Sequence, residues 1–451
     1  MLFWNGVQGA TTATLVVRAT ADGTVLWNID GRHVTAEAAT ATQDGLVRLD
    51  VTGLAPGTAY RYTVTEPGGG SGSGSIKTFP ESGPVTLAFG GCNDEQKGGG
   101  FAFLEPLGVQ AFIMLGDEGY NEDALFDTAL AAQDIGEHYL LHRGPRLVGF
   151  QKRAMAKVGM GWVYDDHDLF SNDLTGDLTD MNTKLGNQGR SYTLTSEQAD
   201  AAIVAAGQAA VAYSLGNPPN TDAEADDGAF YFRFTAGNVE VFVLSQVMPF
   251  LPSELTDLRP DNDGSSALLG TNQTAWLKAR LLASTATFKL ILSPKQTLSA
   301  TNNNPDSWSN GYTDLTGLLE WIDASGVTGV IWGCSDYHSP NIHAAIKTTA
   351  GELAATGHGF DHVAVTPCPM QRIDDVRDCG AFGTATRWGV DAATFPEREN
   401  NNDLQCFGLV ETTESYIQIS AHRSRNGSKM FGPVRVAAGS NALTYPATRT
   451  T

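Results

Sequence analysis

Two patterns of hydrophobic and polar residues divide the chain. Up to about Pro80, apolar and polar residues alternate in short runs, and these runs are separated by Gly, Asp and Pro. Such alternation is typical of half-buried strands joined by tight turns. The clearest runs are TLVVRAT, TVLWNI, LVRLDV and YRYTV. They predict a small all-β sandwich at the start of the chain.

A run rich in glycine and serine, GGGSGSGS, extends from Gly68 to Ser75. Its composition alone indicates an interdomain linker. We interpret it as a hairpin loop, because the following SIKTFP has the pattern of the last strand of the same sandwich. The preceding segment VTGLAPGTAYRYTV resembles the immunoglobulin-like fibronectin type III pattern, in which Tyr60 or Tyr62 would form a tyrosine corner.

From about Pro84 onward, apolar strands alternate with helical segments, which is typical of a layered α/β domain. The strands are predicted at PVTLAFGGC, VQAFIMLGD, MGWVYDDHD, NVEVFVL, FKLILS and VTGVIWGCSD, and FGLVETTESYIQISAHR reads as closing strands. The clearest helices are TAWLKARLLAS and DLTGLLEWIDAS. We therefore predict an α/β (α+β) chain with two domains, an all-β sandwich over residues 1–82 and a layered domain over 83–451.

Length and charge limit the possible partners. A chain of 451 residues exceeds what one hydrophobic core usually serves. The formal charge of −21 repels nucleic-acid backbones and anionic lipid surfaces, so we expect neither as a general binding partner. Solubility or a salty habitat explains the charge equally well. No stretch is long and uncharged enough to span a membrane.

Cysteine usage and the first residues bear on the compartment. Five cysteines are too few and too scattered for a disulfide scaffold, although they leave room for a single bridge between Cys368 and Cys379. The odd count leaves at least one free thiol, for which we choose Cys92. The start MLFWNGVQGATTATLVV has no basic segment before a long apolar core, while a leader already removed remains an open alternative.

Acidic and sulfur-bearing side chains follow several of the predicted strands. These signatures are FGGC ending at Cys92, LGDEGY ending at Tyr120, DDHDLFSND from Asp165 to Asp173, and CSDYH ending at His338. Strands that end in Asp, Asn, Cys, Tyr and His deliver metal ligands to one edge of a sheet. The pattern predicts a multinuclear metal site and metal-assisted phosphoester chemistry.

Each residue also has a structural interpretation. Asp117 follows the run AFIML and is placed either to bridge two metal ions or to cap a helix. Cys92 offers a thiolate ligand, although buried free cysteine is common. Tyr120 offers a phenolate or is a partly buried aromatic residue.

The remaining candidates lie in two later segments. In DDHDLFSND the acids crowd around His167 and Asn172. Carboxylates packed so closely repel one another unless cations are present, which indicates a cation site. The alternative is that they are solvated turn residues. In CSDYH, Asp336 and His338 are two residues apart and face one side of an extended segment. Three other histidines are interpreted as pocket-wall or surface residues, namely His343, His358 and His362.

Together these motifs resemble the PhoD-like alkaline phosphatases of the calcineurin-like metallophosphoesterase superfamily, over nearly the whole chain. Two further segments carry the resemblance by their order and spacing, ALLGTNQTAWLKARLLASTATFKLILSPKQ and DSWSNGYTDLTGLLEWI. The resemblance implies a catalytic β-sandwich flanked by helices over residues 83–451, preceded by the small β domain. It also implies a site that holds a ferric ion with calcium ions.

The resemblance assigns roles residue by residue. Iron would be bound by Cys92, Asp117, Tyr120 and His338. Calcium would be bound by Asp117, Asn172 and Asp336. Asp166 would support the cluster, and His167 would orient the phosphoryl group or protonate the leaving alkoxide. Water activated by the metal ions would be the nucleophile, so no covalent phosphoenzyme is expected.

The chain departs from the family pattern at one place. Where such proteins usually show L-D-x-R after the mid-domain strand, this chain reads VFVLSQVMPF, with Ser245 and Val247 in place of the Asp and the Arg. The loss of that Arg would alter substrate choice or weaken turnover. Arg259 is near enough in sequence to bind substrate instead.

Two functions follow from different classes. The first, which we favour, is an extracellular, periplasmic or surface-associated phosphodiesterase and phosphomonoesterase that releases phosphate from small organic esters. The second is a binding or structural surface or particle protein that uses the same scaffold with little catalysis. Retention of the predicted ligands favours the enzyme, whereas the Ser245 and Val247 departure and the appended sandwich favour the alternative. The sequence leaves the oligomeric state open.

Overall fold

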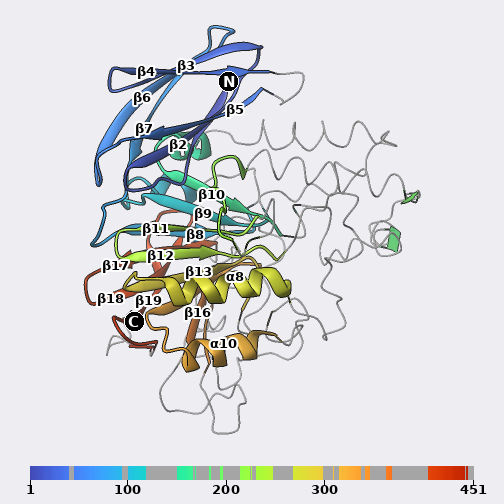
Figure 1. Ribbon diagram of the computed structural model, residues 1–451, viewed down its shortest axis with the longest axis vertical. Helices are drawn as coiled ribbons and strands as arrows, with labels where there is room; N and C mark the ends of the chain where they lie inside the picture. The colour runs from blue at the N-terminus through green and yellow to red at the C-terminus, as the bar shows by residue number, and fades with distance from the viewer. Residues whose placement is uncertain are drawn as a thin grey trace.

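Figure 1 shows the computed structural model of the chain. The described residues are 1–39, 45–93, 100–117, 150–165, 168, 182–183, 193, 195–196, 214–223, 225, 230–246, 268–297, 308, 314–336, 341–345, 362–367, 405–441 and 443–444.

The first 80 residues form the predicted sandwich. A four-stranded sheet has the order β4-β3-β6-β7, and its strands are β3 (Gly23–Ile29), β4 (Arg32–Ala38), β6 (Ala59–Thr65) and β7 (Ser71–Lys77). It packs against β1 (Leu2–Gly6), β2 (Thr12–Arg18) and β5 (Leu46–Thr52). Alternate residues of β2, among them Leu15 and Val17, enter the core between these strands, as the two-residue period of a strand requires.

The predicted tyrosine corner can be checked directly. The backbone N–H of Ala55 donates a hydrogen bond of 2.7 Å to Oη of Tyr60, five residues later in the chain. Tyr62 has a different role, because its buried hydroxyl donates to Oδ1 of Asn5 over 2.8 Å. Of the two predicted residues, Tyr60 therefore makes the corner-type hydrogen bond.

The run from Gly68 to Ser75 lies in a hairpin, although most of it is strand rather than loop. Strand β7 begins at Ser71 and pairs with β6 in the register Thr65 to Ser71. Glycine is required within this strand, since a Cβ on Gly74 would lie 2.6 Å from Cζ of Tyr62. The glycines that suggested a flexible loop instead leave room for aromatic rings.

A ten-stranded sheet has the order β20-β19-β18-β17-β8-β9-β10-β1-β2-β5. Its further strands are β8 (Thr86–Gly90), β9 (Ala111–Leu115), β10 (Gly159–Val163), β17 (Cys406–Thr412), β18 (Tyr416–Arg423), β19 (Lys429–Ala437) and β20 (Leu443–Thr444). Strands β8, β9, β10 and β1 are parallel neighbours. The sheet is thus continuous across the predicted domain boundary at residue 82, and that boundary stays a prediction.

A six-stranded sheet has the order β11-β12-β13-β14-β16-β15. Its strands are β11 (Phe232–Ala236), β12 (Val239–Val243), β13 (Phe288–Ser293), β14 (Val330–Cys334), β15 (Asn341–Ala345) and β16 (His362–Thr366). Strands β12, β13, β14 and β16 run parallel. Side chains of both sheets, such as Phe89 and Leu292, share one fully buried core, so the two sheets form a sandwich.

Helices cover the outer faces of this sandwich. Helices α8 (Gly270–Ala283) and α10 (Asp314–Ala324) pack against the six-stranded sheet through a second core. The 3₁₀ helix η1 (Gly100–Phe103) and helix α4 (Phe150–Met155) pack against the ten-stranded sheet. The predicted fold class, a β-sandwich flanked by helices and preceded by a small all-β sandwich, is confirmed. Within the described residues, no helix is both long and apolar enough to cross a bilayer.

Candidate active site

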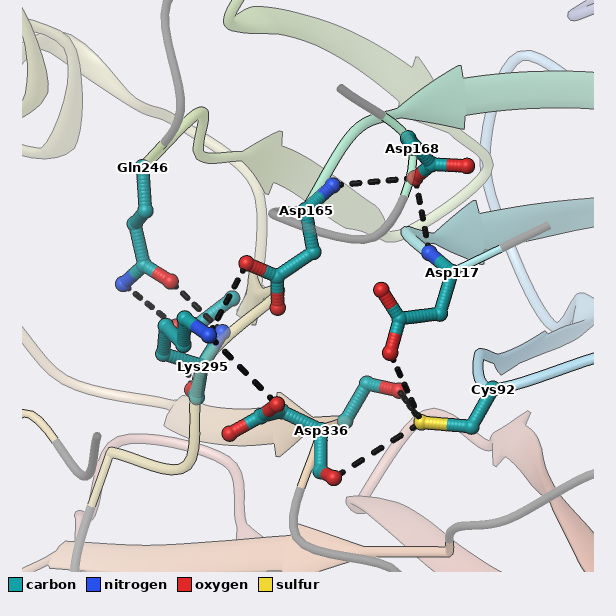
Figure 2. A network of polar contacts seen from close by, with 9 residues as sticks. Cys92, Asp117, Asp165, Asp168, Gln246, Lys295 and Asp336 are labelled. Atoms are coloured by element: carbon teal, nitrogen blue, oxygen red, sulfur yellow. Dashed lines mark hydrogen bonds and ion pairs between the residues drawn. The ribbon is translucent and has the colours of Figure 1, made fainter. Parts of the chain in front are cut away.

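Five polar residues occupy the same position relative to five parallel strands. Each stands two residues beyond the last residue of its strand. They are Cys92 after β8, Asp117 after β9, Asp165 after β10, Lys295 after β13 and Asp336 after β14. Because these five strands run parallel to one another within each sheet, their carboxyl ends lie at one edge, and the sandwich brings the two edges together. Figure 2 shows these five side chains around a common centre.

The backbone at three of these positions is unusual for residues with a side chain. Cys92, Asp117 and Asp336 have φ angles of +54°, +54° and +72°. Left-handed backbone is uncommon outside glycine and concentrates at functional sites. Among the described residues, the fourth case without glycine is Asp30, in the turn between β3 and β4. The strained positions therefore coincide with three of the predicted metal ligands.

The thiol of Cys92 joins the two sheets. Its Sγ lies 3.6 Å from Oδ2 of Asp117 and 3.7 Å from the backbone oxygen of Asp336. It also lies 3.9 Å from Oγ of Ser335. Cys92 and Asp117 are both almost completely buried. Three residues predicted from separate motifs thus meet in space.

A second predicted motif contributes Asp165 and Asp168. Oδ2 of Asp168 accepts hydrogen bonds from the backbone N–H of Asp117, over 2.7 Å, and of Asp165, over 3.0 Å. One carboxylate oxygen therefore holds the segments that follow β9 and β10 at a fixed separation (Figure 2). Both acids are 1% exposed, so they are not solvated turn residues.

Lys295 places a cation among these carboxylates. Its Nζ lies 3.1 Å from Oδ1 of Asp165 and 3.4 Å from Oδ1 of Asp336. The side chain of Lys295 is 11% exposed. Burying charged groups in this way is tolerated where they are paired. The ammonium thus offsets part of the acidic charge at this edge.

Glycine permits the close approach of the strand ends. Gly116 has φ +80°, and a Cβ there would lie 2.5 Å from Cβ of Asp165 and 2.6 Å from its backbone N. On the opposite side, a Cβ on Gly91 would overlap Oγ of Ser335. Only residues without a side chain let these segments come so near one another.

Cys334, in the motif CSDYH, differs from Cys92. Burial raises the pKa of its thiol to about 11, and its Sγ is hydrogen-bonded to Oγ1 of Thr297 over 2.8 Å. Thiolate, rather than thiol, is the metal ligand and nucleophile. Cys334 therefore remains a protonated structural thiol, while Cys92 faces the acids of the site. Among the described cysteines, Cys92, Cys334 and Cys406 are buried and form no disulfide.

At Ser245, where the chain departs from the family pattern, the backbone is bonded to helix α8. The backbone N–H of Ser245 donates to Oε1 of Gln273 over 2.9 Å, and Nε2 of Gln273 donates back to the Ser245 oxygen over 2.7 Å. This pair fixes the end of β12 to helix α8. Ser245 itself is buried.

Several predicted residues lie outside the described part of the chain. They are Tyr120, Asp166, His167, Asn172, Val247, Arg259, His338, Cys368 and Cys379. Their predicted roles stay predictions. The strands that carry His343 and His362 are described, but their side chains are not.

Sequence reasoning did not select Lys295, Gln246 or Asn93 as site residues, and it named Asp165 and Asp168 only as crowded acids of the motif DDHDLFSND. The rule that placed Cys92 and Asp117 just past a strand would also have found Lys295, which follows FKLILS at the same spacing. Asn93 is 1% exposed and donates its backbone N–H to the oxygen of Asp117 over 2.8 Å. No pattern in the sequence distinguishes it from an ordinary loop asparagine.

The donor types at the described edge fit the metal ions that the resemblance implies. The thiol of Cys92 suits a transition metal, and the carboxylates of Asp117 and Asp336 suit both such an ion and calcium. Considering the described residues alone, no group of three or more His, Cys, Asp or Glu side chains is arranged to hold a metal ion. The predicted ligand sets each include residues outside that part of the chain.

Comparison with known proteins gives a consistent result. A family model described as PhoD-like phosphatase matches residues 142–414. A solved structure described as the structure of PhoD is 16% identical, with a TM-score of 0.71, over 99% of this chain and 92% of that chain. A purple acid phosphatase, PPD1 from yellow lupin (Lupinus luteus) seeds, is 11% identical with a TM-score of 0.57, over 94% of this chain and 72% of that one. No protein of curated function matches this chain by sequence.

The two solved structures share the fold of this chain, and the family model extends over more than half of its length. The resemblance stated from the sequence motifs is thereby confirmed. The chain belongs to the PhoD-like phosphatase family and is a phosphoric ester hydrolase.

Proposed function

We propose that the chain hydrolyses small phosphate esters by a metal-dependent reaction in which water attacks phosphorus directly. The observation that carries this proposal is the convergence of Cys92, Asp117 and Asp336, each with left-handed backbone and each just beyond a parallel strand. A thiol and two carboxylates at one buried edge suit cation binding better than they suit an acyl-transfer or redox site.

The residues divide by ligand chemistry. Cys92 and Asp117, with Tyr120 and His338, would hold a ferric ion, and Asp117 and Asp336, with Asn172, would hold calcium. When bound, these ions supply positive charge for the phosphoryl oxygens and lower the pKa of a water molecule.

Side chains of the protein would position the site, orient the phosphoryl group and protonate the leaving group. Asp168 fixes the spacing between the segments of Asp117 and Asp165, which follow neighbouring strands of the ten-stranded sheet. Asp166 supports the cluster, and His167 orients the phosphoryl group or protonates the leaving alkoxide, a role that histidine often has in catalysis. Arg259 binds substrate.

The biological setting that we propose is phosphate scavenging outside the cytoplasm, from diesters and monoesters. The PhoD-like phosphatase family supports this setting. The formal net charge of −21 repels anionic esters, so such a substrate would require local cations at the site.

The test is hydrolysis of a chromogenic phosphodiester and of its monoester at alkaline pH with added calcium. We expect turnover by the wild type, and a loss of about 100-fold or more in Asp117→Asn and Asp336→Asn. Iron content and visible absorbance are measured on the same samples, because ferric iron bound by thiolate and phenolate is coloured.

A pair of thiol variants provides the matched control. Cys92→Ala should lose both iron and colour, whereas Cys334→Ala should retain both, because the Cys334 thiol is bonded to Thr297 and protonated. An iron-loaded wild type that hydrolyses neither ester would instead support a binding or structural role for the scaffold.

A further inference from the structure

Lys295 enters the candidate active site from the carboxyl end of β13. Its Nζ lies between Oδ1 of Asp165, at 3.1 Å, and Oδ1 of Asp336, at 3.4 Å (Figure 2). The two carboxylates come from different sheets, since Asp165 follows β10 and Asp336 follows β14. The ammonium therefore links the two sheets at the edge where the predicted ligands meet.

The backbone of Lys295 is held by side chains next to it. Oε1 of Gln246 accepts a hydrogen bond from the Lys295 N–H over 2.6 Å, and Nε2 of Gln246 donates to Oγ of Ser293 over 2.8 Å. Oγ of Ser293 in turn donates to the Lys295 oxygen over 2.7 Å. Gln246 and Ser293 are buried, so the position of Lys295 is built into the fold.

Gln246 also connects Lys295 to the departure from the family pattern. It stands between Ser245 and Val247, where the family usually shows an Asp and an Arg. The segment that has lost its cation thus fixes another cation, Lys295, in the site.

The ammonium of Lys295 balances the negative charge of the two carboxylates beside it. Asp165 is 1% exposed, and a carboxylate so buried requires a cation close by. A divalent ion on Oδ1 of Asp336 would compete directly with the ammonium for that oxygen. Two carboxylates on one ammonium resemble the oxygen environment that a hard divalent cation prefers.

We propose that the ammonium of Lys295 fills a cation subsite between Asp165 and Asp336, where it stands in place of a divalent ion. The site then carries one permanent cation of its own and takes fewer divalent ions than its acidic residues would otherwise bind. This inference rests on the proposed role of Asp336 as a cation ligand.

The experiment is calorimetric titration of Ca²⁺ into the full chain, as wild type and as Lys295→Gln. We expect Lys295→Gln to bind about one further Ca²⁺ per chain, or to bind Ca²⁺ at least about tenfold more tightly. Lys295→Arg should behave as the wild type, because it restores a cation. Unchanged or weaker Ca²⁺ binding by Lys295→Gln would overturn the proposal.

Lys289, on the strand β13 that leads to Lys295, provides a matched control. It is also buried, but its Nζ donates to the backbone oxygen of Ala286 and does not take part in the network of Figure 2. Lys289→Gln should therefore titrate as the wild type. If Lys295→Gln is unstable without metal, Ca²⁺ should raise its Tm more than that of the wild type, and an equal rise in both would also overturn the proposal.

The titration separates this inference from the proposed function. Wild type that hydrolyses esters, together with Lys295→Gln that gains no Ca²⁺, would overturn the inference alone. Wild type that hydrolyses no ester, together with Lys295→Gln that gains Ca²⁺, would overturn the proposed function alone.

Discussion

One oxygen of Asp168 serves two backbone amides, those of Asp117 and Asp165. Charged acceptors make stronger hydrogen bonds than neutral ones, and here one acceptor defines the spacing of two strand ends. At the scale of single residues, the site thus depends on a carboxylate that need not contact substrate. Asp168 is a positioning residue.

Replacing Asp168 with Ala should lower kcat by about 10- to 100-fold, because both strand ends lose their common acceptor. Leaving two buried amides without that acceptor should also cost about 2 kcal/mol of unfolding free energy. Steady-state kinetics and urea unfolding measure the two effects. Asp168→Asn keeps a carbonyl oxygen as acceptor, so its losses in kcat and in unfolding free energy should both be smaller. Wild-type kcat in Asp168→Ala would contradict the positioning role.

A second residue-scale prediction concerns His422 on β18. Burial lowers the pKa of its imidazole below 6.5, and its ring nitrogens are bonded to the oxygen of Gly427, at 2.8 Å, and to Oγ of Ser420, at 3.1 Å. The unfolded chain therefore takes up this proton before the folded chain does as pH falls. The stability that His422 contributes is present above about pH 6.5 and is lost as pH falls below it.

The measurement is the unfolding free energy of wild type and His422→Gln between about pH 8 and pH 5. We expect the advantage of the wild type to shrink as pH falls through this range. His33→Gln, at an exposed histidine on β4, is measured alongside as the matched substitution. A difference that stays constant with pH would contradict the prediction for His422.

Sequence reasoning placed Cys92, Asp117 and Asp336 correctly at strand ends, because apolar runs followed by Asp or Cys are visible without any structure. It did not select Lys295, since a lysine after a strand looks like an ordinary surface residue. Its burial depends on Asp165 and Asp336, which come from other parts of the chain. Such pairing across sheets is invisible in local patterns.

At the scale of elements, Asp222 fixes helix α8 to the six-stranded sheet. Its carboxylate accepts two hydrogen bonds of 2.8 Å from Arg233 on β11 and one of 2.9 Å from Nε1 of Trp276 on α8. Arg280, also on α8, lies 3.4 Å away. The hydrogen bond from Arg233 lowers the pKa of Asp222 to about 2. One acid therefore joins a strand and a helix.

Asp222→Ala should destabilise the chain by about 3 kcal/mol at neutral pH, because it leaves two guanidinium groups and an indole without this acceptor. The contribution of Asp222 is fully present above its ordinary pKa of 3.8, and it is lost as pH falls toward about 2. Urea unfolding of Asp222→Ala and of the wild type, at neutral pH and at a pH near 2, measures the difference in unfolding free energy. Asp222→Asn, which retains an oxygen for Trp276, should fall between Asp222→Ala and the wild type. Equal stability of Asp222→Ala and the wild type at neutral pH would show that this contact does not hold the helix.

Strands could be predicted from the sequence where nearly all their residues are buried, and less well where a strand is exposed or rich in glycine. Strands β8, β9, β10, β12, β13 and β14 are mostly apolar and buried along nearly their whole length, and they were all predicted. Strand β4 was not, since RHVTAEA is mostly polar and lies at the edge of its sheet, where little of it is buried. The hairpin glycines of β7 misled the prediction because they leave room for aromatic rings, Gly72 for that of Phe3 and Gly74 for that of Tyr62.

At the scale of the whole molecule, the first strands are part of the central architecture. Strand β1 pairs in parallel with β10, and Val7 and Phe79 lie in the core between the two main sheets. Trp4, which is fully buried, packs edge-on against Trp162 of β10 at 6.2 Å. The sequence predicted two domains because its pattern changes from short alternating runs to strands mixed with helices. Such a change carries no information about which strands pair with one another.

Removing residues 1–82 should therefore leave a chain that does not fold stably. The deletion exposes the edge of β10, whose neighbour Asp165 belongs to the candidate active site, and it opens the core that Val7 and Phe79 help to fill. We expect the full chain to unfold in one calorimetric transition and the shortened chain to lose cooperative unfolding and ester hydrolysis.

A single substitution tests the coupling between the first strands and β10 without a deletion. Trp4→Ala should cost about 3–5 kcal/mol and speed amide hydrogen exchange in β10. Two separate transitions in the full chain, together with unchanged exchange in β10 of Trp4→Ala, would show instead that the small sandwich is an independent domain.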